Sequence, residues 1–200
     1  NYSRFVNKSE SDVIRFGYIG RINPTKGIDI LIRAFKKLSI TTKTKLTIYG
    51  RANKWEQAYF QELQELASGD ERIEFFGKYE RQEITKVFNA IDVVVLPSVW
   101  YENYPIALLE AISHRTPIIA SEIGGIPELV SIHNAGWLFP HGDVDRLFEL
   151  LLMCTNRPEK ISEQVNRIRL PRPVSAEADE ILSIYQILIN KFSMAVDYEC

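Results

Sequence analysis

The fold is decided by residues 13–38, which read VIRFGYIGRINPTKGIDILIRAFKKL. Residues 13–19 form a short β-rich run, and apolar side chains in residues 28–38 recur with the 3.6-residue period of one helix face. A turn segment with two cations, residues 20–27, lies between them. A strand, a turn and an amphipathic helix in this order are the first half of a βαβ unit.

The same alternation continues along the chain without a hairpin signature, which predicts parallel strands covered by helices on both faces. Strands are expected at residues 13–19, 45–49, 72–76, 92–96, 117–120 and 135–139. Helices are expected at residues 26–38, 54–67, 80–89, 105–114 and 143–154, the last with Asp143 as its N-cap.

We therefore predict an α/β fold, a Rossmann-like doubly wound parallel sheet of about six strands flanked by helices. One domain is expected over residues 1–200, with its core at about residues 13–154 and a C-terminal helical segment at about residues 158–192.

In a doubly wound sheet, ligands bind outside the carboxyl ends of the first and fourth strands. The segments at these ends are residues 20–27 and 97–104, which we expect to face each other. Arg21 and Lys26 flank the start of the first helix, where cations and free N–H groups together favour an anion such as a diphosphate. Two solvated surface cations are the alternative.

The composition excludes several classes of protein. A hydrophobic fraction of 46%, a charged fraction of 25% and a net charge of -2 argue against disorder and against a basic nucleic-acid-binding surface. Cys154 and Cys200 form no disulfide framework, which favours a reducing, cytoplasmic setting, and no apolar stretch approaches the roughly 20 residues of a transmembrane helix. No metal is expected, since His114, His133 and His141 show no ligand spacing.

Glu102 and Glu110 are separated by seven residues in ENYPIALLE. If a helix begins at Pro105, Glu102 lies in the loop over the crevice and Glu110 in the second helical turn. The free N–H groups of Ile106 and Ala107 would then point at an anion, with a carboxylate on either side to accept hydrogen bonds from hydroxyls. This arrangement fits a sugar, a diphosphate and a ribose in sequence; two unrelated surface charges are the alternative.

Three motifs carry a family resemblance: FGYIGR at residues 16–21 followed by Lys26-Gly27, the Glu-x7-Glu unit, and SEIGGIPELV at residues 121–130. Together, and in this order, they resemble the C-terminal, donor-binding domain of retaining glycosyltransferases of the GT-B fold, family 4 (glycosyl transferases group 1). The similarity covers roughly residues 13–154. No Gly-x-Gly-x-x-Gly or P-loop motif is present, which argues against dinucleotide dehydrogenases and P-loop NTPases.

The resemblance implies a site for a nucleoside diphosphate sugar without a metal or other cofactor. It assigns the diphosphate to Arg21 and Lys26, the sugar to Glu102, the ribose to Glu110 and the nucleobase to the backbone near Tyr79. The catalytic residues would be Glu102, Arg21 and Lys26. The donor-binding residues would be Gly20, Arg21, Lys26, Gly50, Tyr79, Glu102, Asn103, Tyr104, Ile106, Ala107 and Glu110.

One departure bears on specificity. Where the family's loop commonly reads Glu-Gly-Phe-Gly, residues 102–105 read Glu-Asn-Tyr-Pro, so the N–H that relatives offer to the sugar is missing at Pro105. Gly124 and Gly125 are expected to form a tight turn beside the crevice, with Glu128 near the start of a short helix.

The resemblance also implies that an N-terminal acceptor domain is absent from this chain. The full-length hexosyltransferase would transfer sugar with retention to a glycan or glycolipid, in polysaccharide, lipopolysaccharide or glycolipid synthesis, in the cytoplasm or peripherally at the membrane through the missing half. The isolated domain would be inactive. A last helix at residues 175–191 would pack on the missing half. A GT-B epimerase or phosphorylase and a non-catalytic nucleotide-binding module remain alternatives, and the base, sugar, acceptor and oligomeric state stay open.

Overall fold

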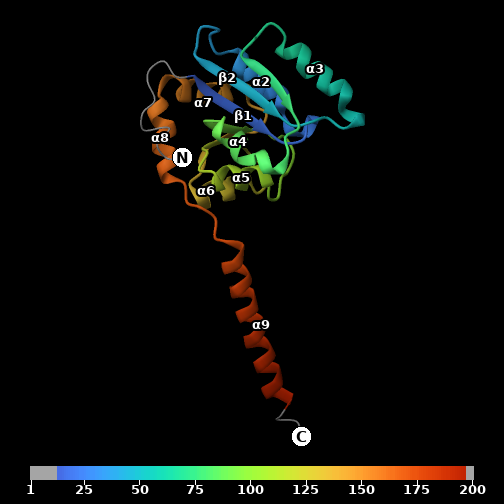
Figure 1. Cartoon of the computed structure of the whole chain (residues 1–200), viewed down its shortest axis with the longest axis vertical. Helices are drawn as coiled ribbons and strands as arrows, with labels where there is room; N and C mark the ends of the chain where they lie inside the picture. Colours follow the sequence, from blue (N-terminus) through green and yellow to red (C-terminus); the bar gives the residue numbers. More distant parts are fainter. Residues whose placement is uncertain (1–12, 197–200) are drawn as a thin grey trace. The chain divides into compact units, whose positions relative to one another are not determined.

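The structure is a computed structural model that describes residues 13–196. It divides at Leu170 and Pro171 into two units, the first an α/β unit and the second a long helix, α9 (Val174–Val196) (Figure 1). The predicted core, residues 13–154, lies in the first unit. The predicted C-terminal segment, residues 158–192, extends from the first unit into the second.

The first unit is built on one sheet of six strands in the order β3-β2-β1-β4-β5-β6. Every neighbouring pair is parallel. The strands are β1 (Ile14–Ile19), β2 (Thr44–Tyr49), β3 (Ile73–Gly77), β4 (Val93–Leu96), β5 (Ile118–Glu122) and β6 (Gly136–Pro140). This order confirms the predicted doubly wound, Rossmann-like sheet, and each strand lies within two residues of its predicted bounds.

Helices cover both faces of this sheet. They are α2 (Ile28–Lys36), α3 (Gln57–Ala67), α4 (Ile84–Asn89), α5 (Ile106–Ser113), α6 (Ile126–His133), α7 (Val144–Asn156) and α8 (Pro158–Arg167), with 3-10 turns η1 (Pro24–Lys26), η2 (Lys54–Glu56) and η3 (Arg81–Glu83). Side chains of α2, α3 and α7 form one hydrophobic core and those of α4, α5 and α6 the other.

Strand β4 shows why the sequence produces two cores. Val93 and Val95 pack in the core beside α2, while Val94 and Leu96 pack in the core beside α5. All four side chains are buried. A parallel strand covered on both faces therefore reads as a continuous apolar run.

The first predicted helix differs from the observed one. It begins as the 3-10 turn η1, and the chain then passes through Gly27, whose φ of 63° lies in the left-handed region, before α2 begins at Ile28. The later helix α7 begins as predicted, because the Asp143 side chain accepts hydrogen bonds from the N–H groups of Asp145 (3.0 Å) and Arg146 (2.9 Å).

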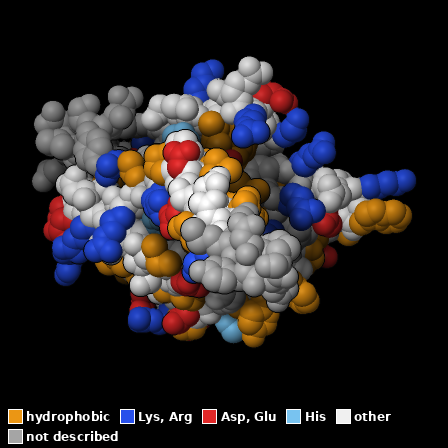
Figure 2. Space-filling view, turned by 90° about the horizontal axis from the view of Figure 1, so that it is seen from below, with side chains coloured by type: hydrophobic (Ala, Val, Ile, Leu, Met, Phe, Trp, Pro, Cys, Tyr) orange, Lys and Arg blue, Asp and Glu red, His pale blue; other side chains and the backbone are white. Residues whose placement is uncertain are grey.

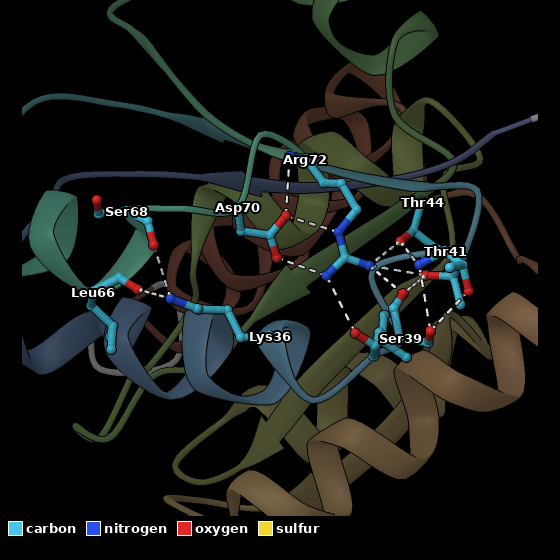
Figure 3. Close-up of polar contacts among 10 residues, drawn as sticks. Lys36, Ser39, Thr41, Thr44, Leu66, Ser68, Asp70 and Arg72 are labelled. Carbon is cyan, nitrogen blue, oxygen red and sulfur yellow. Dashed lines mark hydrogen bonds and ion pairs between the residues drawn. The ribbon is translucent and has the colours of Figure 1, made fainter.

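Arg72 links the loops that precede β2 and β3, at the end of the sheet where the strands begin (Figure 3). Its guanidinium forms a two-pronged pair with Asp70, at 2.8 Å and 2.7 Å, and donates to the Ser39 carbonyl at 2.8 Å. Lys36 similarly donates to the Leu66 carbonyl at 2.7 Å, which ties α2 to the end of α3. These contacts hold the edge of the sheet opposite the predicted ligand site.

Helix α9 carries apolar side chains that are exposed within its own unit. Ile181, Ile184, Tyr185 and Leu188 are all exposed, and packing of this face on another domain stays a prediction.

Within residues 13–196, no helix has the combination of length and apolar character that crossing a membrane requires. Basic and acidic side chains both occur on the face drawn in Figure 2, in keeping with the near-neutral net charge. Cys154 is buried as a free thiol, and Cys200 lies outside the described residues.

Candidate functional site

The two loops predicted to form the site do face each other. The N–H of Val99, after β4, donates to the carbonyl of Thr25, after β1, at 2.9 Å. A Cβ atom on Gly27 would lie 2.1 Å from the Pro97 carbonyl oxygen. Only glycine allows this approach, so Gly27 brings the loops together at the carboxyl ends of β1 and β4.

A first cavity of about 400 Å³ opens between these loops and the start of α5. It is lined by seven of the predicted donor-binding residues: Gly20, Arg21, Lys26, Glu102, Tyr104, Ile106 and Ala107. Residues that follow β1 and residues that follow β4, about 80 positions apart in the sequence, thus meet in one concave site, where a doubly wound sheet binds its ligands.

Two of the charged side chains that line the first cavity are paired with each other. Lys26 forms an ion pair with Glu102, and their side chains are 23% and 18% exposed. Ser98 donates a hydrogen bond to the same Glu102 carboxylate oxygen at 3.3 Å. Arg21 forms no hydrogen bond or ion pair through its side chain with any residue of the described range. The cavity therefore holds one neutralised cation and one that is available to a ligand.

Tyr18 is a contributor to the first cavity that the sequence did not reveal. Its side chain is 1% exposed, lines the cavity, and donates its hydroxyl hydrogen to the Arg21 carbonyl at 2.7 Å. Burial raises the pKa of Tyr18 above its usual range, so the phenol stays a donor. The only sequence signal was a hydroxyl within an apolar strand, three residues before a predicted ligand-binding arginine. Ser98 was not predicted either, because a single serine in a loop carries no signal of its contact with Glu102.

A second cavity, of about 300 Å³, adjoins the first, sharing with it Ile19, Gly20, Arg21, Ile106 and Ala107. Beyond the shared residues it contains three of the other four predicted residues, Gly50, Tyr79 and Glu110, and three that were not predicted: Tyr49, Arg51 and Lys78. The shared residues make the two cavities one continuous hollow.

Glu110 is half-buried in the second cavity. Burial raises the pKa of its carboxyl, while the charges of His114 and Arg81 oppose the shift. Burial also raises the pKa of the Tyr79 phenol, with a smaller contribution from Glu110. A carboxylate that is partly desolvated and, like Glu110, forms no ion pair among the described residues gains from hydroxyl donors brought by a ligand.

Helix α5 begins at the boundary of the two cavities. Pro105 is its N-cap, with φ of -68° and ψ of 118°, so the helix starts one residue later than predicted. Because the first N–H groups of a helix lack acceptors within it, those of Ile106 and Ala107 are available where the two cavities meet. The positive end of the helix dipole therefore faces the hollow.

Asn103 alone among the predicted donor-binding residues lines neither of these cavities. Its backbone instead lies against the Gly124–Gly125 turn, where a Cβ atom on Gly125 would be 2.2 Å from the Asn103 carbonyl oxygen. The Gly125 N–H donates to the Glu102 carbonyl at 2.7 Å. The two glycines thus support the loop that carries Glu102, and Glu128 lies in α6 directly after them.

The model of the family described as glycosyl transferases group 1 matches residues 2–169. The chain belongs to this family. The domain is 33% identical over 141 residues to an uncharacterized glycosyltransferase of Methanocaldococcus jannaschii, a match that covers 70% of this chain and 35% of that protein. It is 32% identical over 142 residues to a D-inositol 3-phosphate glycosyltransferase of Mycobacterium marinum, covering 70% and 29%. The group 1 domain therefore spans about a third of the length of these curated relatives.

Solved structures agree with the fold of this glycosyltransferase domain. Anabaena Alr3699/HepE, crystallised in complex with UDP, superposes with a TM-score of 0.71 at 24% identity, over 92% of this chain and 49% of that one. The C-terminal domain of a glycosyl transferase group 1 family protein (LpcC) from Francisella tularensis superposes with a TM-score of 0.64 at 25% identity, over 76% of this chain and 80% of that one. The first unit is thus a GT-B glycosyltransferase domain.

Within residues 13–196, no group of three or more His, Cys, Asp and Glu side chains is arranged to hold a metal ion. The expectation that no metal is required remains a prediction.

Proposed function

We propose that this domain binds a nucleoside diphosphate sugar and forms the donor half of a retaining, family 4 glycosyltransferase. The observation that carries the proposal is the continuous hollow formed by the two cavities, with Arg21 and the start of α5 at its middle. A carboxylate lies on either side, Glu102 in the first cavity and Glu110 in the second. Charges in this order match a ligand that is anionic at its centre and carries hydroxyls at both ends.

The diphosphate would occupy the boundary of the two cavities. Arg21 would pair with it through the guanidinium, and the N–H groups of Ile106 and Ala107 would donate from the positive end of α5. Lys26 would reach the phosphate nearer the sugar. These same groups would stabilise the negative charge that develops on the departing diphosphate when the sugar is transferred, so that no metal or other cofactor is needed.

The two ends of the donor would then be read by carboxylates. Glu102 would accept hydrogen bonds from the sugar, and Glu110 from the ribose, with the nucleobase beside Gly50 and the backbone of Tyr79. Alr3699/HepE, which has also been crystallised with UDP-glucose and in that complex is 25% identical to this chain, makes UDP the first nucleotide to test.

Sugar transfer would need an N-terminal acceptor domain, with the glycan or glycolipid acceptor entering between the halves. We place the full-length enzyme in polysaccharide, lipopolysaccharide or glycolipid synthesis on the cytoplasmic side of the membrane. The name of one relative, an amylovoran biosynthesis glycosyltransferase of Erwinia amylovora with 30% identity over 147 residues, supports this setting.

Calorimetric titration of the chain with UDP, GDP and ADP tests the donor site. We expect Lys26→Ala to weaken binding of the preferred nucleotide about 10- to 100-fold and Glu110→Gln to weaken it about fivefold, because each removes hydrogen bonds to a charged group. Lys37→Ala and Glu149→Gln are matched controls, since both side chains are in ion pairs outside the two cavities. Equal losses in the site variants and the controls would refute the proposal, and so would the absence of binding to the unaltered chain at millimolar nucleotide.

A further inference from the structure

The two residues that the proposed function assigns to the sugar and to its phosphate are bound to each other. Lys26, in η1, and Glu102, in the loop after β4, form an ion pair across the first cavity. Both side chains are mostly buried, so the pair is screened less by water than a surface pair is. A ligand phosphate that approaches Lys26 therefore competes with the Glu102 carboxylate for the ammonium group.

We infer that the Lys26–Glu102 pair is a latch that couples binding of the diphosphate to release of the Glu102 carboxylate. The inference rests on the proposed function and concerns its regulation. The anionic diphosphate competes with Glu102 for the Lys26 ammonium, and the loss of that partner leaves the carboxylate in need of new donors. The sugar hydroxyls of an intact donor supply them.

Arg21 and Ser98 give the latch its order of events. Arg21 lines both cavities and has no side-chain hydrogen bond or ion pair among the described residues, so it can engage an incoming diphosphate without breaking a contact. Lys26 then turns from Glu102 to the phosphate. Ser98 keeps its hydrogen bond to the Glu102 carboxylate, which holds that group over the cavity after Lys26 has left.

The latch predicts discrimination between substrate and product. A nucleotide sugar satisfies both halves of the separated pair, Lys26 by phosphate and Glu102 by hydroxyls. A free nucleoside diphosphate satisfies only Lys26 and leaves a partly buried carboxylate without its cation. Affinity for the free diphosphate is therefore held down, which favours its release after transfer. A nucleoside monophosphate does not reach Lys26 and leaves the latch closed.

A double-mutant cycle measures the latch directly. UDP, with GDP and ADP alongside, is titrated into the unaltered chain, Glu102→Gln, Lys26→Met and the double variant, with the matching monophosphates as control ligands. We expect Glu102→Gln to raise affinity for the diphosphate about two- to fivefold when Lys26 is present, because the competing ion pair is lost. The same change should leave diphosphate affinity unaltered in the Lys26→Met background and monophosphate affinity unaltered in both.

Other outcomes overturn the latch. An equal gain in both backgrounds would mean that Glu102 merely repels anions, and a loss of affinity in Glu102→Gln would mean that it only orients Lys26. Absence of nucleotide binding to the unaltered chain would instead refute the proposed function itself. Glu149→Gln, with the same charge change on α7, controls for net charge, and Glu102→Asp gives the same direction of change if Glu102→Gln melts early.

A second measurement compares UDP-glucose with UDP. The ratio of the UDP-glucose affinity to the UDP affinity should be lower in Glu102→Gln than in the unaltered chain. An unchanged ratio would contradict the latch.

Discussion

Replacing Gly125 with alanine tests whether the Gly124–Gly125 turn holds the Glu102 loop in place. Gly125 has φ of -82°, which alanine adopts without strain, so the substitution probes close packing alone. The new Cβ atom would lie 2.2 Å from the Asn103 carbonyl oxygen. That distance is about 1 Å short of van der Waals contact, so the two backbones must move apart by about that much.

The cost of this separation has two parts. Overpacking of a well-fitted contact costs about 1–3 kcal/mol. Weakening the 2.7 Å hydrogen bond from the Gly125 N–H to the Glu102 carbonyl costs about 1 kcal/mol more. A loss of about 2–4 kcal/mol in the free energy of unfolding lowers the Tm of a unit of this size by about 5–15 °C.

Thermal unfolding by circular dichroism and calorimetric titration with UDP-glucose and UMP are the assays. Because Glu102 moves by about 1 Å, we expect Gly125→Ala to weaken the binding of UDP-glucose about tenfold. UMP, which under the proposed function would bind away from Glu102, should keep its affinity. Gly142→Ala is the control, since Gly142 has φ of 80° but no atom within 4 Å of a new Cβ, and only local strain follows. If Gly125→Ala has the same Tm as the unaltered chain, the packing role of Gly125 is refuted.

Three further outcomes are expected. Glu110→Gln should raise Tm at pH 7, because burial penalises the charged carboxylate of the unaltered chain. As the pH falls through the raised pKa of Glu110, the unaltered chain becomes protonated there too, and the difference in Tm between the two proteins should disappear. Thermal melting from pH 3 to pH 7 measures this difference. Asp70→Asn should destabilise the fold by about 3 kcal/mol at pH 7 by leaving the Arg72 guanidinium without its anion, as urea unfolding would measure. The hydrogen bond from Arg72 lowers the pKa of Asp70, so this cost should shrink only in strong acid. Asp143→Ala should cost about 1 kcal/mol by removing the α7 cap, whereas an unchanged urea midpoint would contradict that role.

Strand β4 could be predicted closely because it is a continuous apolar run. Val93 to Leu96 are buried on both faces of the sheet, so no alternation had to be recognised. The α2 boundary was harder, since Lys26 continues the helical pattern while the φ of 63° at Gly27 interrupts it. Close approach to Pro97 requires that glycine, and a tertiary contact of this kind leaves no local pattern.

Most residues that line the two cavities could be expected from the sequence, but the contacts among them could not. Glu102 and Lys26 were each expected at the crevice, yet they lie 76 residues apart in sequence, and nothing local indicates that they pair. Tyr18 was hidden for a related reason: its aromatic ring suits the interior of β1, and only the folded turn brings its hydroxyl to the Arg21 carbonyl. Sequence motifs indicate which polar groups a ligand site contains. Only the tertiary structure shows which of these groups contact one another in the absence of ligand.

Pro105 shows how one residue links helix geometry to specificity. Its ring fixes φ near -68° and its ψ of 118° is not helical, so α5 begins at Ile106 rather than at Pro105 itself. The first N–H available to an anion is therefore that of Ile106, at the boundary of the two cavities, and none is offered from position 105 to the sugar end of the first cavity. Under the proposed function, recognition of the sugar would then fall to the Glu102 carboxylate, which forms an ion pair with Lys26. If the proposed function and the latch hold, the missing donor at Pro105 and the Lys26–Glu102 ion pair act on the same step, because both would leave sugar recognition to a carboxylate that is freed when the diphosphate binds.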